Sequence, residues 1–139
     1  MRVLKFGGTS VGTVRSLSNV KKIVESIEEP CVVVVSALGG LTDRLIAGAE
    51  MARDGNAEYH REVETARRRH LEIIEALVSP PRRKDITARI EELLAELTRL
   101  YEGIALLGDL TDRTLAQVVS FGERMSSPPV AEVIENATN

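Results

Sequence analysis

The sequence has no tryptophan, only 3% aromatic residues and a single cysteine, Cys31. One cysteine cannot form a disulfide within the chain, so we expect a reduced, buried thiol rather than a disulfide-stabilised framework. The net charge of -3 gives no general attraction to nucleic acid or to an anionic membrane surface. The two short basic runs, at 67–69 and 82–84, have acidic neighbours, and we interpret them as solvated faces. Nucleic acid is therefore not an expected partner.

Long apolar runs are also missing. No stretch approaches the roughly 20 residues that a membrane-spanning helix needs, and the amino-terminal apolar run stops at Phe6, before two glycines. We expect a cytoplasmic protein without a membrane partner, and we interpret the match of 136–138 to a glycosylation acceptor as chance. The 139 residues are enough for one domain with its own core.

What the sequence does contain is a short apolar run that ends in Lys5 and turns through paired glycines, Gly7 and Gly8, followed by Thr9 and Ser10. We interpret this stretch as a strand, an anion-binding loop and a helix. Adjacent glycines let the backbone approach an anion closely, and the helix amino terminus directs unpaired N–H groups at the same place. Lys5 adds a mobile positive charge, so phosphate is the expected ligand.

Two widespread phosphate motifs do not fit this stretch. In a Walker A loop the lysine follows the glycines, whereas Lys5 precedes them. The dinucleotide fingerprint G-x-G-x-x-G does not match residues 7–12, which disfavours the nucleotide-binding domain of a dehydrogenase. A turn that needs glycine for its geometry alone remains the alternative.

A second strand, loop and helix follow the first. Apolar residues recur at helical spacing from 14 to 27, and Pro30 cannot continue that helix. The run 31–35 is apolar and rich in valine, which is typical of a strand buried on both faces. The short crossover implies that the two strands are parallel, with a right-handed connection.

The second strand also ends in a glycine-bearing loop, which contains Ser36, Gly39 and Gly40. Because the carboxyl ends of parallel strands meet at one edge of a sheet, we expect the two loops to form one phosphate site. Thr42 and Asp43 open the next helix, which runs to about residue 53. For Asp43 we prefer the interpretation of a helix cap.

Beyond residue 56 the pattern becomes helical. We expect helices over 57–78 and 85–107, separated by 79–81 and folded as an antiparallel hairpin. Such a hairpin could be a lid, a dimerisation arm or plain packing against the sheet, and packing is the default. His60 and His70 lie on one helix but do not share a face, so we assign no metal site to them.

A last helix is expected over 110–125, and it contains Gly122. Glycine inside a helix costs about 1 kcal/mol relative to alanine, so we expect a ligand or a neighbouring element to approach closely there. Glu123 beside it is then a candidate recognition carboxylate, although an exposed surface glutamate is the simpler interpretation.

In order and spacing, three motifs resemble the amino-terminal part of aspartate kinase, and the resemblance covers nearly the whole chain. They are Lys5-Phe6-Gly7-Gly8-Thr9-Ser10-Val11, the loop 34–37 with Gly40-Leu41-Thr42, and Ser120-Phe121-Gly122-Glu123-Arg124. The sequence is also similar in style to the kinase portion of bifunctional aspartokinase and homoserine dehydrogenase chains. The implied fold class is α/β: a three-layer amino-acid kinase-like fold with parallel strands and an inserted helical hairpin. Residues 1–139 would form only its amino-terminal portion.

The resemblance implies transfer of the γ-phosphoryl group of ATP, bound with Mg²⁺, to the side-chain carboxylate of L-aspartate, the first step towards lysine, threonine and methionine. Lys5 matches the family's catalytic lysine. The matches to phosphate-binding residues are Gly7, Gly8, Thr9, Ser10, Ser36, Gly39 and Gly40. Thr42 and Glu123 match the aspartate contacts, with Glu123 meeting the ammonium group of the substrate.

The sequence also departs from the family. The family's catalytic domain continues well beyond this length, with most of the adenine, ribose and magnesium contacts and an arginine for the aspartate carboxylate, and regulatory ACT domains are missing. Pro128 and Pro129 should kink or end the last helix. We expect a fragment that is inactive alone and that forms a homo-oligomer through open strand edges or the hairpin. A noncatalytic binding or dimerisation module with the same fold is the alternative.

Overall fold

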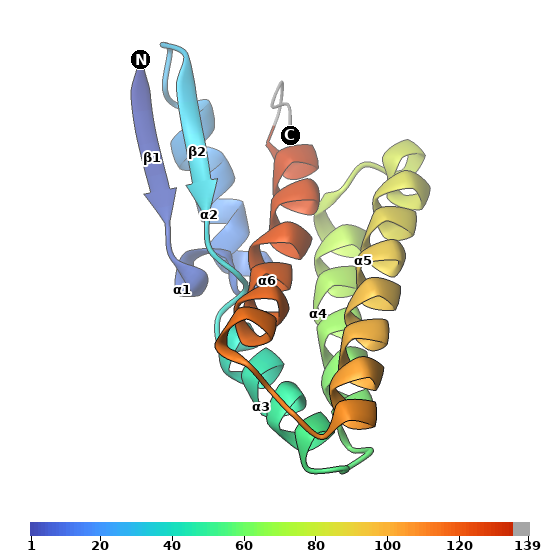
Figure 1. The fold of residues 1–139 in the computed structure, drawn as a ribbon. Coiled ribbons are helices and arrows are strands. Elements are labelled where there is room, and N and C mark those ends of the chain that lie inside the picture. Colours follow the sequence, from blue (N-terminus) through green and yellow to red (C-terminus); the bar gives the residue numbers. More distant parts are fainter. Residues whose placement is uncertain (135–139) are drawn as a thin grey trace.

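The computed structural model describes residues 1–134, so the glycosylation-acceptor match at 136–138 lies outside the described residues. Figure 1 shows a small sheet with α2 behind it, and a group of longer helices beside it. In chain order, the elements of the described part are β1 (Arg2–Phe6), α1 (Gly8–Val11), α2 (Val14–Glu25), β2 (Cys31–Val35), α3 (Leu41–Arg53), α4 (Tyr59–Leu77), α5 (Pro80–Leu107) and α6 (Asp112–Val133). No helix within residues 1–134 combines the length and apolar character needed to cross a bilayer.

The two strands are parallel and adjacent, as the short crossover predicted, and Lys5 pairs with Val34 in the register. Among residues 1–134, elements cover only one face of this sheet. Val3, Val32 and Val34 on the other face are 69%, 46% and 43% exposed, so the expectation that β2 is buried on both faces is wrong. Helix α2 covers one face only in the described part of the chain, which leaves alternate side chains of both strands in solvent. Cys31 is likewise half-buried rather than buried.

The first loop contains a short helix that the sequence did not indicate. Helix α1 spans a single turn, and α2 begins only after Thr13. The hydroxyl of Thr13 accepts a hydrogen bond from the backbone N–H of Ser16 at 3.1 Å, and the hydroxyl of Ser16 accepts one from the N–H of Thr13 at 3.1 Å. This reciprocal capping box fixes the start of α2.

Helix α3 begins at Leu41, directly after Gly40, which has a positive φ of 77°. No side chain in the described part of the chain caps this helix, so the interpretation of Asp43 as a cap is wrong. Asp43 instead lies within the first turn, where its negative charge complements the positive end of the helix dipole.

Helices α4 and α5 form the expected antiparallel hairpin (Figure 1). Helix α5 starts at Pro80 rather than at residue 85, because proline is tolerated in the first helical turn, where its missing N–H would have no partner. Within residues 1–134 the hairpin packs mainly on α3 and α6 rather than on the sheet, so that detail of the expectation is wrong.

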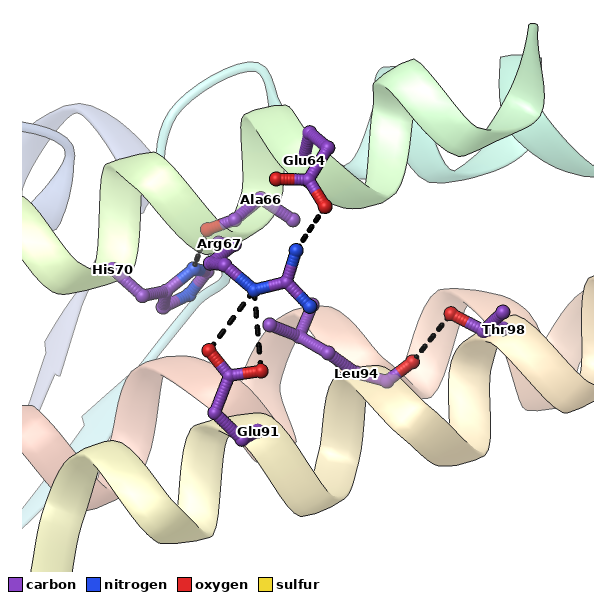
Figure 2. Close-up of polar contacts among 7 residues, drawn as sticks. All are labelled: Glu64, Ala66, Arg67, His70, Glu91, Leu94 and Thr98. Carbon is purple, nitrogen blue, oxygen red and sulfur yellow. Dashed lines mark hydrogen bonds and ion pairs between the residues drawn. The ribbon is translucent and has the colours of Figure 1, made fainter.

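Arg67 joins the two helices of the hairpin. Its Nε lies 2.9 Å and 3.1 Å from the two carboxylate oxygens of Glu91 on α5, and a second nitrogen pairs with Glu64 on its own helix, as Figure 2 shows. The interpretation of 67–69 as a solvated face therefore fails for Arg67, which is half-buried.

Helix α6 continues through Pro128 and Pro129 to Val133, so of the two expected outcomes, a kink or an end of the helix at the prolines, the second is wrong. Each proline lacks the N–H that would bond one turn back. Burial of side chains in this part of the helix compensates for the missing bonds, since Pro129, Val130 and Val133 are buried. The Nζ of Lys21 also donates to the carbonyl oxygen of Val133 at 3.0 Å and so ties the last turn to α2.

Candidate functional site

The two glycine loops touch each other at the carboxyl ends of β1 and β2. We call residues 7–12 loop 1 and residues 36–40 loop 2. A Cβ on Gly8 would lie 2.9 Å from the carbonyl oxygen of Ala37 and 3.2 Å from the Cα of Gly39. A Cβ on Gly12 would lie 3.2 Å from the backbone nitrogen of Gly39. The loops therefore meet, as the parallel strands predicted, and glycine is required because the two backbones pack directly on each other.

The remaining loop glycines have a different reason for being glycine. At Gly7 and Gly40, no atom of the described residues lies within 4 Å of the position a Cβ would take, so both border open space. Gly40 needs glycine for its positive φ, which lets loop 2 turn into α3. Thr42 is half-buried in the first turn of that helix. Open space beside both loops is what an anion needs to reach their backbone N–H groups.

Lys5 lies on the exposed face of the sheet, two residues before Gly7. It shares that face with Val3 and with its partner across the ladder, Val34. Alternation along the strand places Leu4 and Phe6 on the covered face instead. The Lys5 ammonium group therefore stands in solvent at the end of the sheet where both loops emerge. Its role in phosphoryl transfer stays a prediction.

Backbone hydrogen bonds hold both loops in place. The N–H of Ser36 donates to the carbonyl oxygen of Phe6 at 3.1 Å, which extends the strand ladder by one residue. The N–H of Ser10 donates to the carbonyl oxygen of Gly7 at 3.0 Å, and the N–H of Leu41 donates to that of Leu38 at 2.9 Å. Thr9 is exposed beside them. Both loops are thus short, closed turns.

Helix α6 rests on loop 2. A Cβ on Gly122 would lie 2.6 Å from the Cβ of Ala37, so the predicted close approach is real and its partner is a neighbouring element. One turn further on, the buried hydroxyl of Ser126 donates to the carbonyl oxygen of Ser36 at 2.8 Å. Sequence reasoning missed Ser126, although it lies only two residues after the end of the third motif. Glu123, between these two residues, is exposed.

Arg69 is a second residue that sequence reasoning missed. It projects from α4 and donates to the carbonyl oxygen of Gly12 at 3.3 Å, at the end of loop 1. Burial, reinforced by the charge of Arg44, lowers the pKa of this guanidinium below its usual value. It borders a cavity of about 390 Å³ lined by residues 12–15, Arg69, Glu72 and Ile73. No signal in the run 67–69 distinguishes this arginine from its neighbours.

The histidines do not gather with other metal ligands. Among residues 1–134 no group of three or more His, Cys, Asp and Glu side chains is placed to hold a metal ion. His70 is fully buried, and its Nδ1 lies 2.6 Å from the carbonyl oxygen of Ala66 (Figure 2). Burial lowers the pKa of His70 to about 4, so the ring is neutral at physiological pH.

Comparison with known proteins agrees with the resemblance to aspartate kinase. The chain is 36% identical over 134 residues to lysine-sensitive aspartokinase 3 of Escherichia coli, covering 95% of this chain and 28% of that protein. It is 33% identical over 129 residues to chloroplastic aspartokinase 1 of Arabidopsis thaliana, covering 90% of this chain and 22% of that protein. Bifunctional aspartokinase/homoserine dehydrogenase 2 of Escherichia coli also matches, at 30% identity. The chain thus spans between 16% and 28% of the length of these relatives.

A solved structure matches the fold. The crystal structure of Escherichia coli aspartokinase III in complex with aspartate and ADP superposes with a TM-score of 0.83 at 32% sequence identity, covering 96% of this chain and 28% of that one. The expected amino-acid kinase-like fold class is therefore confirmed for its amino-terminal portion. The model of the amino acid kinase family matches residues 1–137. Because this match includes Lys5, both loops and α6, the chain belongs to the amino acid kinase family.

Proposed function

We propose that this chain is the amino-terminal part of an aspartate kinase, and that the complete enzyme phosphorylates the side-chain carboxylate of L-aspartate with ATP to form 4-phospho-L-aspartate. The observation that carries the proposal is the contact between the two glycine loops at the end of the sheet where Lys5 emerges. The aspartate and ADP named with the solved relative agree with it.

The chemistry requires little from the protein beyond positioning and charge. A carboxylate oxygen of aspartate attacks the γ-phosphorus, the bond from that phosphorus to the bridging oxygen breaks, and ADP leaves with the electron pair. The carboxylate is already deprotonated, so no general base is needed. Holding the two reactants in line and neutralising the negative charge that spreads over the transferring group are then sufficient.

In this proposal the two loops share one task. Gly7, Gly8, Thr9 and Ser10 of loop 1, with Ser36, Gly39 and Gly40 of loop 2, bind the phosphates of ATP. Lys5 neutralises charge on the transferring phosphoryl group. Thr42 and Glu123 bind aspartate, with the Glu123 carboxylate accepting from the substrate's ammonium group. Mg²⁺ enters as the usual companion of ATP, and we derive no step through it.

The setting of the enzyme follows from the same proposal. Aspartyl phosphate production is the entry to lysine, threonine and methionine synthesis, in the cytoplasm. The exposed sheet face of Val3, Val32 and Val34 supports association with another polypeptide surface, and we propose a homo-oligomer. A noncatalytic binding module with the same fold is the competing function.

A trapping assay tests the proposal. The complete protein, with ATP and L-aspartate, should yield an acyl phosphate that hydroxylamine converts into aspartyl hydroxamate, in an amount equal to the ADP released. The 139-residue chain alone should yield none. If the complete protein forms no hydroxamate, whether or not it binds ATP, the proposed kinase activity is rejected. The noncatalytic binding module then remains as the function.

A further inference from the structure

Helix α6 contacts loop 2 through two small residues one helical turn apart. At Gly122 the absence of a side chain lets the helix reach Ala37, since a Cβ would lie only 2.6 Å from the Cβ of that residue. At Ser126 the side-chain oxygen lies 2.8 Å from the carbonyl oxygen of Ser36. Residues four apart lie on one face of a helix. The same face of α6 therefore makes both contacts, and both residues are buried.

The hydroxyl of Ser126 has one hydrogen to donate and two candidate acceptors. The carbonyl oxygen of Ser36 lies at 2.8 Å, and that of Glu123, within the same helix, lies at 3.3 Å. A hydroxyl donates one hydrogen bond at a time, and 2.8 Å is the usual length of a good O–H···O bond. The bond to Ser36 is therefore the one that this side chain makes.

Ser36 is held from two sides. Its N–H donates to the carbonyl oxygen of Phe6 at 3.1 Å, and its C=O accepts from Ser126 at 2.8 Å. The next two residues, Ala37 and Leu38, are buried with exposures of 4% and 1%. Loop 2 then reaches Gly39, which packs against Gly8 of loop 1. The point at which the loop leaves the sheet is thus set jointly by β1 and by α6.

We propose that Ser126 is a positioning residue that holds loop 2 against α6. The proposal rests on the function proposed above, in which loop 2 binds phosphate and Glu123, three residues before Ser126, binds aspartate. The Ser126 hydrogen bond then keeps the phosphate-binding backbone of loop 2 at a constant place relative to α6, the helix that carries Glu123. Reaction by direct attack depends on that spacing, because small misplacements of aligned reactants are costly.

The first test measures hydrogen exchange in this chain and does not depend on activity. Ser126→Ala removes the donor, and Ser126→Cys keeps a group of similar size that donates poorly. Both should speed exchange of the Ser36 and Leu41 amides, which close the two ends of loop 2, roughly five- to tenfold, as expected when one hydrogen bond is lost. Amides of the buried α5 residues Leu93 and Leu94 should keep their rates.

The matched control is Ser18→Ala. It removes the same group from a hydroxyl that, in the described residues, donates within its own helix, to the carbonyl oxygen of Val14 at 2.9 Å. Loop 2 exchange should be unchanged in this variant. Equal acceleration of loop 2 and of α5 in Ser126→Ala would mean general destabilisation and would overturn the proposal, as would normal exchange in Ser126→Cys.

The second test uses the complete enzyme and steady-state kinetics. Ser126→Ala should raise the KM for ATP roughly five- to tenfold and lower kcat, and it should leave the KM for aspartate within about twofold, because Glu123 stays on an intact helix. Faster loop exchange without any change in the KM for ATP would overturn the positioning role. If the complete protein has no aspartate kinase activity, the proposed function fails, and the exchange experiment still decides whether Ser126 holds loop 2.

Discussion

The hydroxyl of Tyr101 occupies the space that a side chain on Gly48 would need. It donates to the carbonyl oxygen of Leu45 at 2.8 Å, and a Cβ on Gly48 would lie 2.6 Å from it. Tyr101 is fully buried, and this contact joins α5 of the hairpin to α3, the helix that follows loop 2. The hairpin is thereby attached to the site through one polar group and one missing side chain.

Gly48→Ala should therefore destabilise the protein, although alanine is the better helix former. Overpacking against the ring of Tyr101 costs about 1 to 3 kcal/mol, which exceeds the gain in helix propensity of about 1 kcal/mol. Gly103→Ala is the control, because at this glycine of α5 nothing in residues 1–134 lies within 4 Å of the position a Cβ would take. It should raise the midpoint of thermal unfolding, whereas Gly48→Ala lowers it. A stabilised Gly48→Ala variant would contradict the packing described here.

His70 should make the fold less stable in acid. Burial lowers the pKa of this histidine to about 4 in the folded protein, against an ordinary value of 6.5, with the charge of Arg69 acting in the same direction. The unfolded chain therefore binds the proton first as the pH falls. The contribution of His70 is complete above pH ~6.5 and is lost progressively towards pH ~4, by up to about 3 kcal/mol.

Urea unfolding at pH ~7.5 and ~5 measures this loss. His70→Gln should flatten the pH dependence over this interval. His60→Gln should preserve it, since His60 is exposed. Equal slopes for wild type and His70→Gln would mean that other groups control the acid response.

Lys5→Ala should lower the turnover of the complete enzyme by roughly a hundredfold or more, the scale seen when one electrostatic stabiliser of a transition state is removed. Lys22→Ala removes the same charge from an exposed position on α2 and should leave kcat unchanged. Near-normal turnover in Lys5→Ala would remove this lysine from the mechanism and leave loop 1 as a turn that needs glycine for geometry alone.

Glu123→Gln keeps the shape of the side chain and removes its charge. If the carboxylate contacts the ammonium group of aspartate in both the ground state and the transition state, the substitution weakens binding of both states equally. The KM for aspartate should rise roughly ten- to a hundredfold, equivalent to one charge-assisted hydrogen bond of about 1.5 to 3 kcal/mol, with the KM for ATP nearly constant. Glu132→Gln, on the same helix but paired with Arg82, is the control. A rise in the KM for ATP instead would mean that Glu123 does not bind aspartate and is an ordinary surface residue.

The 139-residue chain should self-associate through the exposed face and edges of its sheet. Val32→Lys places a charge in the middle of that face and should shift sedimentation towards the monomer. Leu106→Lys tests the alternative route through the hairpin, at the carboxyl end of α5, where Leu106 is 87% exposed, and should have little effect. A compact monomer across a wide range of concentrations for the unmodified chain would rule out both routes.

Local signals were enough to predict much of the fold. Helical periodicity located α2 to α6, and the short crossover predicted the parallel pairing of β1 with β2. The glycines were equally informative. Because glycine is costly inside regular structure, Gly122 predicted a close contact, and the two loop motifs predicted that the loops meet. These inferences depend on the spacing and the type of residues, both of which can be read directly from the sequence.

Burial and long-range contacts were decided only by the tertiary structure. The apolar run of β2 has one side in solvent, because which face of a strand is covered depends on elements elsewhere in the chain. Proline normally ends a helix, yet α6 passes Pro128 because burial of the following turn compensates for the missing hydrogen bonds. Ser126 and Arg69 look like ordinary polar residues in the sequence. They reach loop 2 and loop 1 from helices far along the chain, and only packing brings them there.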